Sequence, residues 1–169
     1  MTMIRRFTRC TKGAAAAEMA LIAPFAVLLL FTTLEAGHWL YAQHQVVKGL
    51  RDGARFAARQ SFDVMDCASG SITDATVLSR VRHLTRTGEL SGGTSRVTGW
   101  DDGEITVTID CTNVDSSIAE TGIYDSGDPA RKVIVTTTFP YDSLFNGIGV
   151  LNDSSVNLNG TQEAAAMGI

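Results

Sequence analysis

The sequence predicts an α+β fold, in which a long N-terminal transmembrane helix packs on a small periplasmic domain with a short helix and an antiparallel sheet. Three observations lead to this prediction. An apolar run follows a cluster of basic residues at the N-terminus. Apolar residues then recur at helical spacing as far as Gln60. Beyond residue 61, short segments alternate apolar and polar side chains between turn-forming residues, which is typical of strands.

The first 36 residues have the pattern of a membrane anchor. The first 12 residues hold four of the 14 Lys and Arg residues and none of the 18 Asp and Glu residues. A helix over residues 14–34 would be about 31 Å long, which matches the hydrocarbon core of a bilayer. Basic residues beside an apolar helix stay in the cytoplasm. We therefore expect a basic leader at 1–13, an inner-membrane span at 14–36 and a periplasmic body.

A cleaved secretory signal peptide is the alternative to this anchor. Its basic start would fit, and the small residues of "LEAG" near residue 36 would offer a cleavage site. However, the apolar run exceeds the roughly 7–15 residues of such a signal, and helical patterning continues past Gly37. The length of the run therefore favours a helix that stays attached to the body.

The span is expected to continue as a periplasmic extension over residues 37–60. A narrow apolar stripe at helical spacing predicts the face that packs on the domain, and it consists of Val46, Leu50, Ala54 and Ala57. Gly49 and Gly53 weaken a helix, so we expect them where another element comes close. Arg51, Arg55 and Arg59 share a different face, which we interpret as a solvated flank.

Residues 61–169 are expected to form the small α+β domain. Thr73 is the expected cap of a short helix that ends at Gly88 and packs through Val77, Val81 and Leu84. The segments "RVTGW" and "EITVTID" flank "DDG" and predict a hairpin. "KVIVTTTF" predicts a further strand that ends at Pro140, and "SSVNLNGT" predicts a weaker one. The sheet should thus have about three or four strands.

Charge and cysteine positions limit the chemistry of the chain. Because the basic residues are concentrated in the leader, the body is more acidic than the net charge of -4 suggests, which argues against nucleic acid as a partner. Cys10 would face the reducing cytoplasm, whereas Cys67 and Cys111 would face the oxidising periplasm. We expect these two to form a disulfide, with two free thiols as the alternative. The spacing of cysteines and histidines predicts no metal site.

The N-terminal stretch "KGAAAAEMALIAPFAVLLLF" resembles the class III signal of type IV pilins and pseudopilins. Within that group the chain is similar to the TadE-like pseudopilins of the tight-adherence (Flp) pilus system. "LEAGHWLY" and "LRDGARFAARQ" carry the same resemblance, which covers residues 12–60. The resemblance implies that a prepilin peptidase cuts the Gly13–Ala14 bond and leaves Glu18 as the fifth residue of the mature chain.

The resemblance also implies a role for Glu18. In a staggered assembly its carboxylate would meet the Ala14 ammonium of a neighbouring subunit, so that neither charge stays unpaired in hydrocarbon. The alternative is a carboxylate near the cytoplasmic interface that reaches water by itself.

From these features we expect a minor pseudopilin that takes part in assembly or anchoring of a Flp-type pilus at the inner membrane. Its partners would be prepilin peptidase, other pilins or pseudopilins and pilus assembly proteins, with no cofactor and no small-molecule substrate. One alternative is a single-pass, membrane-anchored periplasmic interaction protein that does not polymerise. The other is a secreted enzyme, which the sequence disfavours because it lacks a nucleophile elbow, a P-loop or a metal motif.

Overall fold

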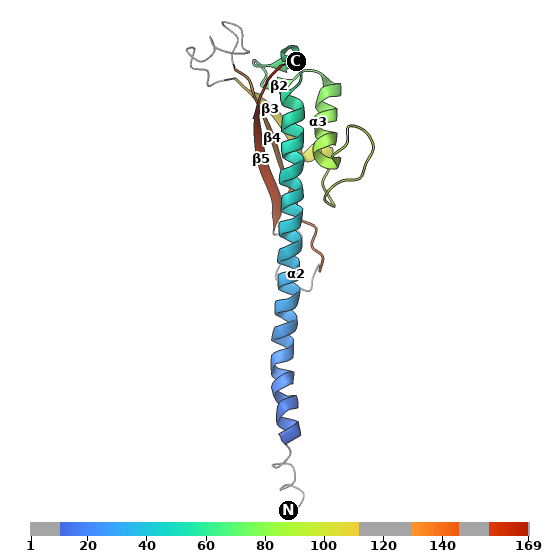
Figure 1. The fold of residues 1–169 in the computed structure, drawn as a ribbon, viewed down its shortest axis with the longest axis vertical. Helices are drawn as coiled ribbons and strands as arrows, with labels where there is room; N and C mark the ends of the chain where they lie inside the picture. The colour runs from blue at the N-terminus through green and yellow to red at the C-terminus, as the bar shows by residue number, and fades with distance from the viewer. Residues whose placement is uncertain (1–10, 112–129, 146–155, 169) are drawn as a thin grey trace, which may run out of the picture.

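The computed structural model describes residues 11–111, 130–145 and 156–168, and one long helix runs along most of its length (Figure 1). This helix, α2, spans Thr11–Ala58 and contains 48 residues. Its C-terminal half carries the domain, and its N-terminal half extends away from it (Figure 1). The predicted helix over residues 14–60 is therefore confirmed, although α2 begins earlier and ends earlier than expected.

The end of α2 is fixed by hydrogen bonds to its last carbonyl groups. The N–H of Arg59 donates to the Phe56 carbonyl, and the N–H of Gln60 donates to the Ala57 carbonyl, so the last turn tightens. The Ala58 carbonyl accepts the N–H of Met167 at 2.8 Å. The C-terminal segment of the chain thus holds the top of α2.

A three-stranded antiparallel sheet packs on α2 through one face. It consists of β3 (Ile105–Asp110), β4 (Lys132–Pro140) and β5 (Asn157–Ala165), in the order β3-β4-β5. The register places Val107 opposite Val135. Side chains of β3 alternate between buried and exposed positions, as the sequence predicts. The strands predicted from "KVIVTTTF" and "SSVNLNGT" are confirmed as β4 and β5, with β5 extending to Ala165.

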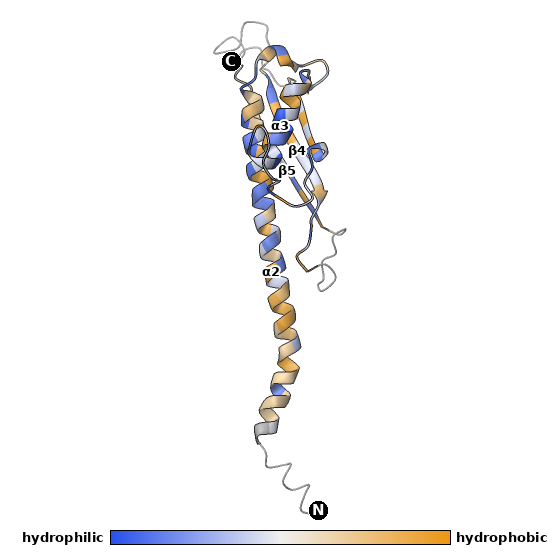
Figure 2. Ribbon diagram, turned by 90° about the vertical axis from the view of Figure 1, so that its right-hand side faces the viewer, coloured by the Kyte–Doolittle hydropathy of each residue, from blue (hydrophilic) through white to orange (hydrophobic). Residues whose placement is uncertain are grey.

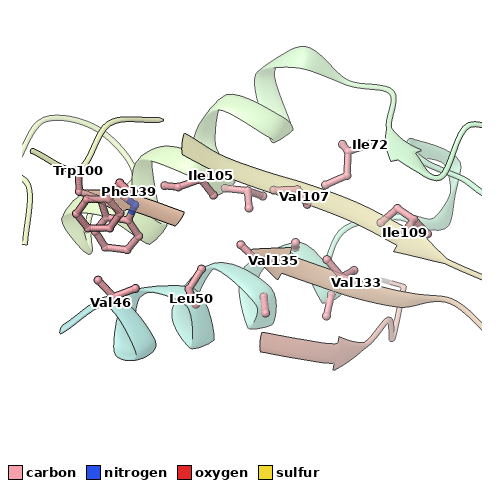
Figure 3. Packing of buried hydrophobic residues seen from close by; sticks show 14 of the residues in the cluster. Val46, Leu50, Ile72, Trp100, Ile105, Val107, Ile109, Val133, Val135 and Phe139 are labelled. Atoms are coloured by element: carbon pink, nitrogen blue, oxygen red, sulfur yellow. The ribbon is translucent and has the colours of Figure 1, made fainter. Parts of the chain in front are cut away.

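The core lies between the sheet, α2 and the loop that precedes β3 (Figure 3). All four residues of the predicted apolar stripe of α2 are buried, and Val46, Leu50 and Ala57 are completely inaccessible to solvent. Val133, Val135 and Leu158 cover them from the sheet. A Cβ atom at Gly160 would lie 2.6 Å from a methyl carbon of Leu50, so β5 approaches α2 more closely than other residues would permit.

The predicted hairpin around "DDG" is wrong. Only its second half is a strand, β3, because residues 96–99 form bends and turns and η2 (Asp102–Glu104) is a 3-10 helix. Trp100 turns into the core instead, where it stacks on Phe139 with ring centroids 5.5 Å apart. Its indole N–H donates to Thr137 Oγ1 at 3.0 Å. Burial of this large side chain outweighs the strand propensity of its neighbours.

The short helix α3 (Ala75–Thr87) lies beside the upper part of α2 (Figure 1). Its cap is Asp74, not Thr73 as predicted: the Asp74 carboxylate accepts the N–H groups of Thr76 and Val77 at 2.7 and 3.3 Å. Thr73 is unavailable because its own N–H and hydroxyl both donate to the Val64 carbonyl. Gly88 ends α3 in the left-handed conformation, with φ of 88°, as expected.

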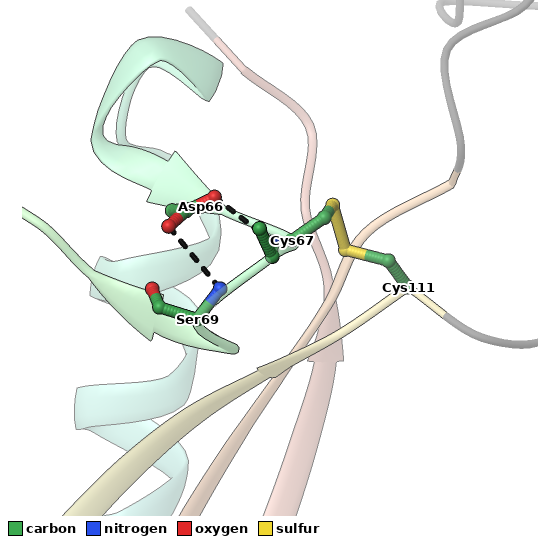
Figure 4. Close-up of a disulfide and its surroundings, with 5 residues drawn as sticks. Asp66, Cys67, Ser69 and Cys111 are labelled. Carbon is green, nitrogen blue, oxygen red and sulfur yellow. Dashed lines mark hydrogen bonds between the residues drawn. A yellow bond between two sulfur atoms is a disulfide. The ribbon is translucent and has the colours of Figure 1, made fainter.

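A small hairpin closes the end of the domain. After η1 (Phe62–Val64), the two-residue strands β1 (Met65–Asp66) and β2 (Ser71–Ile72) pair antiparallel. Asp66 accepts the N–H groups of Ala68 and Ser69 and so shapes the turn between them (Figure 4). The predicted disulfide is present: Cys67 in this turn bonds to Cys111, which follows β3 (Figure 4).

Candidate functional site: the exposed face of helix α2

The N-terminal half of α2 is apolar and bare. Residues 13–30 are all exposed, and most of the ribbon in this part of the helix has the colour of hydrophobic residues in Figure 2. The segment Gly13–Ala58 contains a window long and apolar enough to cross a membrane, with a mean hydropathy of 2.2, and none of that window is buried by the domain. A surface of this size needs a partner or a lipid environment.

The three sequence-predicted residues of the leader junction lie on this bare part. Gly13 and Ala14 stand in the first turn of α2, and a Cβ atom at Gly13 would meet nothing within 4 Å. Glu18 is exposed one turn further along. Within the part of the chain that the structure describes, no side chain pairs with Glu18, so a partner would have to come from elsewhere. Residues 1–10 of the predicted leader, with Cys10, lie outside the described residues.

Above the apolar half, the outward face of α2 becomes cationic. The exposed positions after Tyr41 on α2 and in the turn that follows it are all basic residues, and they are His44, Lys48, Arg51, Arg55 and Arg59. Arg51 donates to the Gln162 side chain at 3.3 Å, whereas Lys48, Arg55 and Arg59 form no ion pair with any other described residue. We call these five residues the basic face. It borders the sheet at one edge, where Arg51 reaches Gln162 of β5, and its other side chains are exposed.

A shallow groove of about 730 Å³ runs along the same side and is lined by residues of α2 alone. Leu40 lies at its lower end and Arg55 at its upper end. The groove therefore begins where the apolar surface ends, and it continues into the basic face. The predicted exposure of Arg51, Arg55 and Arg59 is confirmed. The structure also shows that the basic face continues along α2 from its exposed apolar half.

Sequence reasoning did not predict the contacts at the junction between the two halves of α2. Glu35 is only 7 % exposed, and its two carboxylate oxygens accept the N–H groups of Leu144 and Phe145, each at 3.3 Å. One turn above, His38 Nδ1 lies 2.6 Å from the Tyr141 hydroxyl. An acidic residue directly after an apolar span was the one signal available, since a carboxylate there needs a partner.

Two sets of ion pairs hold other parts of the domain together. Arg96 pairs with Asp52 of α2 at 2.8 Å and ties the loop after α3 to the helix. Lys132 lies between Asp110 and Glu163, and its hydrogen bond to Glu163 raises the pKa of the Lys132 ammonium. No group of three or more His, Cys, Asp or Glu residues among those that the structure describes could hold a metal ion.

Comparison with known proteins gives a family match for helix α2 and none for the domain that follows it. The family model described as TadE-like protein matches residues 13–55, which is about a quarter of the chain and lies entirely within α2. The match confirms the family resemblance predicted from the sequence. No curated protein and no solved structure matches the chain. The matched segment therefore includes both the exposed apolar part of α2 and most of the part that packs on the domain.

Proposed function

We propose that this chain, which carries the TadE-like helix at residues 13–55, is a minor pseudopilin that takes part in assembly or anchoring of a Flp-type pilus at the inner membrane. Similarity to TadE-like proteins implies a role in a tight-adherence pilus system, and such proteins are structural rather than catalytic. The observation that carries the proposal is the division of α2. One half packs one side against its own domain, whereas residues 13–30 of the other half are all exposed and, apart from Glu18, carry no charged side chain.

The proposed topology follows from this division. Residues 1–13 form the cytoplasmic leader, 14–36 cross the inner membrane once, 37–60 extend the helix into the periplasm and 61–169 form the domain. The Cys67–Cys111 disulfide supports the location of the domain, because disulfides persist in the periplasm and are rare in the cytoplasm.

The leader would be removed by a prepilin peptidase at the Gly13–Ala14 bond. The absence of neighbours around Gly13 supports this site, because an enzyme can approach the bond without displacing any described side chain. Cleavage would create an ammonium group at Ala14, close to Glu18 along the helix. Because Glu18 has no partner among the described residues, the ammonium of a neighbouring, staggered subunit is its proposed partner.

Assembly would use the whole outer surface of α2. The apolar half would pack against the helices of other pilins within the membrane, where close packing drives association. The basic face would then meet acidic groups of the neighbouring subunits above the membrane, since opposite potentials favour one orientation of docking. The domain leaves both regions free, which is what an assembling helix requires.

Substitutions at Gly13 and Glu18 test the proposal in a strain that lacks the native copy. We expect Gly13→Leu to keep the full-length mass, whereas the unmodified chain should begin at Ala14. We expect Glu18→Ala to reach the inner membrane normally but to abolish piliation or co-purification with other pilins. Glu18→Asp should restore part of it, since its shorter side chain reaches less far.

A matched control moves the carboxylate without removing it. The double variant Ala15→Glu, Glu18→Ala keeps one acid on the helix but shifts it by one turn, so we expect it to insert and not to assemble. Normal piliation with Glu18→Ala would contradict the pairing and favour a carboxylate that simply reaches water. A mature chain that begins near Gly37 would show instead that the apolar helix is a cleaved signal peptide.

A further inference from the structure

The segment that follows β4 runs down the side of α2, toward its apolar half (Figure 1). We call residues 141–145 the strap. Its start is held in two ways: Tyr141 is 2 % exposed with its hydroxyl at His38, and its N–H donates to the Val156 carbonyl at 3.0 Å. The strap is therefore a packed part of the domain at its upper end, and its lower end reaches beyond the sheet.

The lower end of the strap is apolar and contacts the helix at the top of the proposed span. The Phe145 ring lies edge-on to the Phe31 ring, with centroids 4.8 Å apart. Leu144 is 54 % exposed, although it is a large apolar residue. Both residues are held at the level of Phe31 to Glu35 by the two hydrogen bonds to the Glu35 carboxylate.

This level lies inside the boundary of the bilayer if α2 spans it as proposed. A helix that enters the hydrocarbon at Ala14 leaves it near Leu34, because about 20 residues cross the core. Phe31 is three residues before Leu34, which places it about 4.5 Å below the surface of the hydrocarbon. The ring of Phe145 shares that depth, because it packs on Phe31.

Hydrogen bonding at the strap suits this position. Irregular backbone is costly in a membrane because its N–H groups lack water as an acceptor. Here the N–H groups of Leu144 and Phe145 both reach Glu35, and the hydroxyls of Thr32 and Thr33 donate to the Leu28 and Leu30 carbonyls. These four donors at the proposed bilayer boundary are thus already satisfied by α2.

We propose that the strap inserts Leu144 and Phe145 into the periplasmic leaflet of the membrane, so that the chain contacts lipid at a second place beside its helix. This inference rests on the proposed span. A second contact on one side of the helix restricts the tilt of α2, since tilting the domain away from that side would lift both side chains out of the lipid. Glu35 is the positioning residue that holds the strap at that depth.

Depth-dependent quenching tests the insertion on the full chain. A bimane probe is attached to a single introduced cysteine in a Cys10→Ser background, with the Cys67–Cys111 disulfide left oxidised. The protein is placed in vesicles of phosphatidylethanolamine and phosphatidylglycerol that contain lipids with a nitroxide at a shallow or a deep acyl carbon. We expect the probe at Leu144→Cys to be quenched more strongly by the shallow nitroxide than by the deep one.

Two matched positions separate the inference from the span on which it rests. Leu28→Cys lies on the bare helix and should be quenched by the deep nitroxide, whereas Ser79→Cys lies on the exposed side of α3 and should be quenched by neither. A probe at position 144 that behaves as the one at position 79, while position 28 is quenched, overturns the insertion and leaves the span intact. If position 28 escapes quenching as well, both the span and the insertion are wrong.

Substitution of Glu35 tests its positioning role with the same probe. Glu35→Gln keeps an acceptor and should retain most of the quenching at position 144. Glu35→Leu removes both acceptors, so we expect lipid quenching at position 144 to fall and quenching by aqueous iodide to rise. Unchanged lipid quenching in Glu35→Leu would overturn the role of Glu35. A probe that neither lipid nor iodide reaches would indicate that protein covers the strap, which also contradicts insertion.

Discussion

The Thr85 side chain of α3 occupies the place where a Cβ atom at Gly53 of α2 would stand. Thr85 is completely buried, and its hydroxyl donates to the Val81 carbonyl at 2.7 Å. One turn below, a Cβ atom at Gly49 would lie 2.9 Å from the Trp100 ring. The expected close approach at both glycines is thus confirmed, and it explains why α2 tolerates two residues that weaken a helix.

We expect Gly53→Ala to destabilise the domain by about 1–3 kcal/mol, because α3 must shift to make room for the methyl group. Urea unfolding of the detergent-solubilised chain, followed by tryptophan fluorescence, measures this loss. Gly37→Ala is the matched control, since nothing lies within 4 Å of its Cβ position, and it should be neutral or slightly stabilising. The prediction is wrong if Gly53→Ala behaves as this control, or if Thr85→Ala restores no stability to Gly53→Ala.

The disulfide should contribute a large share of the stability of the domain. Cys67 and Cys111 are 44 residues apart. For a loop of this length, the loss of entropy in the unfolded chain raises the free energy of unfolding by about 4 kcal/mol. The bond also joins the β1–β2 turn to the end of β3 (Figure 4). We expect Cys67→Ser and Cys111→Ser each to lower the urea midpoint, and a reductant to lower that of the unmodified chain but not that of the variants. Thiol labelling without reductant should reach neither Cys67 nor Cys111, and labelling of both would contradict the bond in the exported protein.

Asp74 should make the stability of α3 depend on pH in the acidic range. The N–H of Thr76, and after it the N–H of Val77, lower the pKa of the Asp74 carboxyl by hydrogen bonding to its charged form. The pKa of Asp74 in the folded state thus lies below its value of about 3.9 in the unfolded state. The stabilisation that the charged carboxylate gives the fold is therefore fully present above about pH 3.9 and is lost as the pH falls through the folded-state pKa. We expect Asp74→Ala to lower the Tm at pH 7. The difference in Tm between this variant and the unmodified chain should become smaller at lower pH.

Asp74→Asn provides the control for that titration. Asparagine caps a helix about as well as aspartate but carries no charge, so its Tm at pH 7 should lie close to that of the unmodified chain. The difference in Tm between Asp74→Ala and the unmodified chain could instead stay constant from neutral to strongly acidic pH. That result would contradict stabilisation of α3 by the charged Asp74 carboxylate.

The basic face should matter for assembly and little for folding. We expect Arg55→Glu together with Arg59→Glu to lower the free energy of unfolding by no more than about 1 kcal/mol, because these exposed side chains pair with no described residue and lose only their favourable position at the C-terminal end of the α2 dipole. Co-purification with other pilins should fall, and the remaining association should depend less on salt. Arg80→Glu on the exposed side of α3 is the control for a charge reversal elsewhere. Equal association of both variants would show that the basic face contacts no subunit.

The sequence alone determined the elements whose pattern is local. Helical spacing identified α2 and all four residues of its buried stripe, and alternation identified β3 and β4, because the period of apolar residues reflects which face is buried. The left-handed glycine at the end of α3 and the pairing of Cys67 with Cys111 were also predictable. Each of these features depends on neighbours in the chain or, for the disulfide, on the expected topology, which separates Cys10 from the other two cysteines.

Tertiary structure decided the features that join distant parts of the chain. Thr73 loses the cap to Asp74 because it bonds Val64, and Trp100 leaves the predicted hairpin because Thr137 and Phe139 provide a buried site for it. Glu35 meets its partners only because the strap, more than 100 residues later in the chain, returns to the helix at that level. Such contacts carry no local periodicity, since their free energy comes from burial and hydrogen bonding that exist only after the chain has folded.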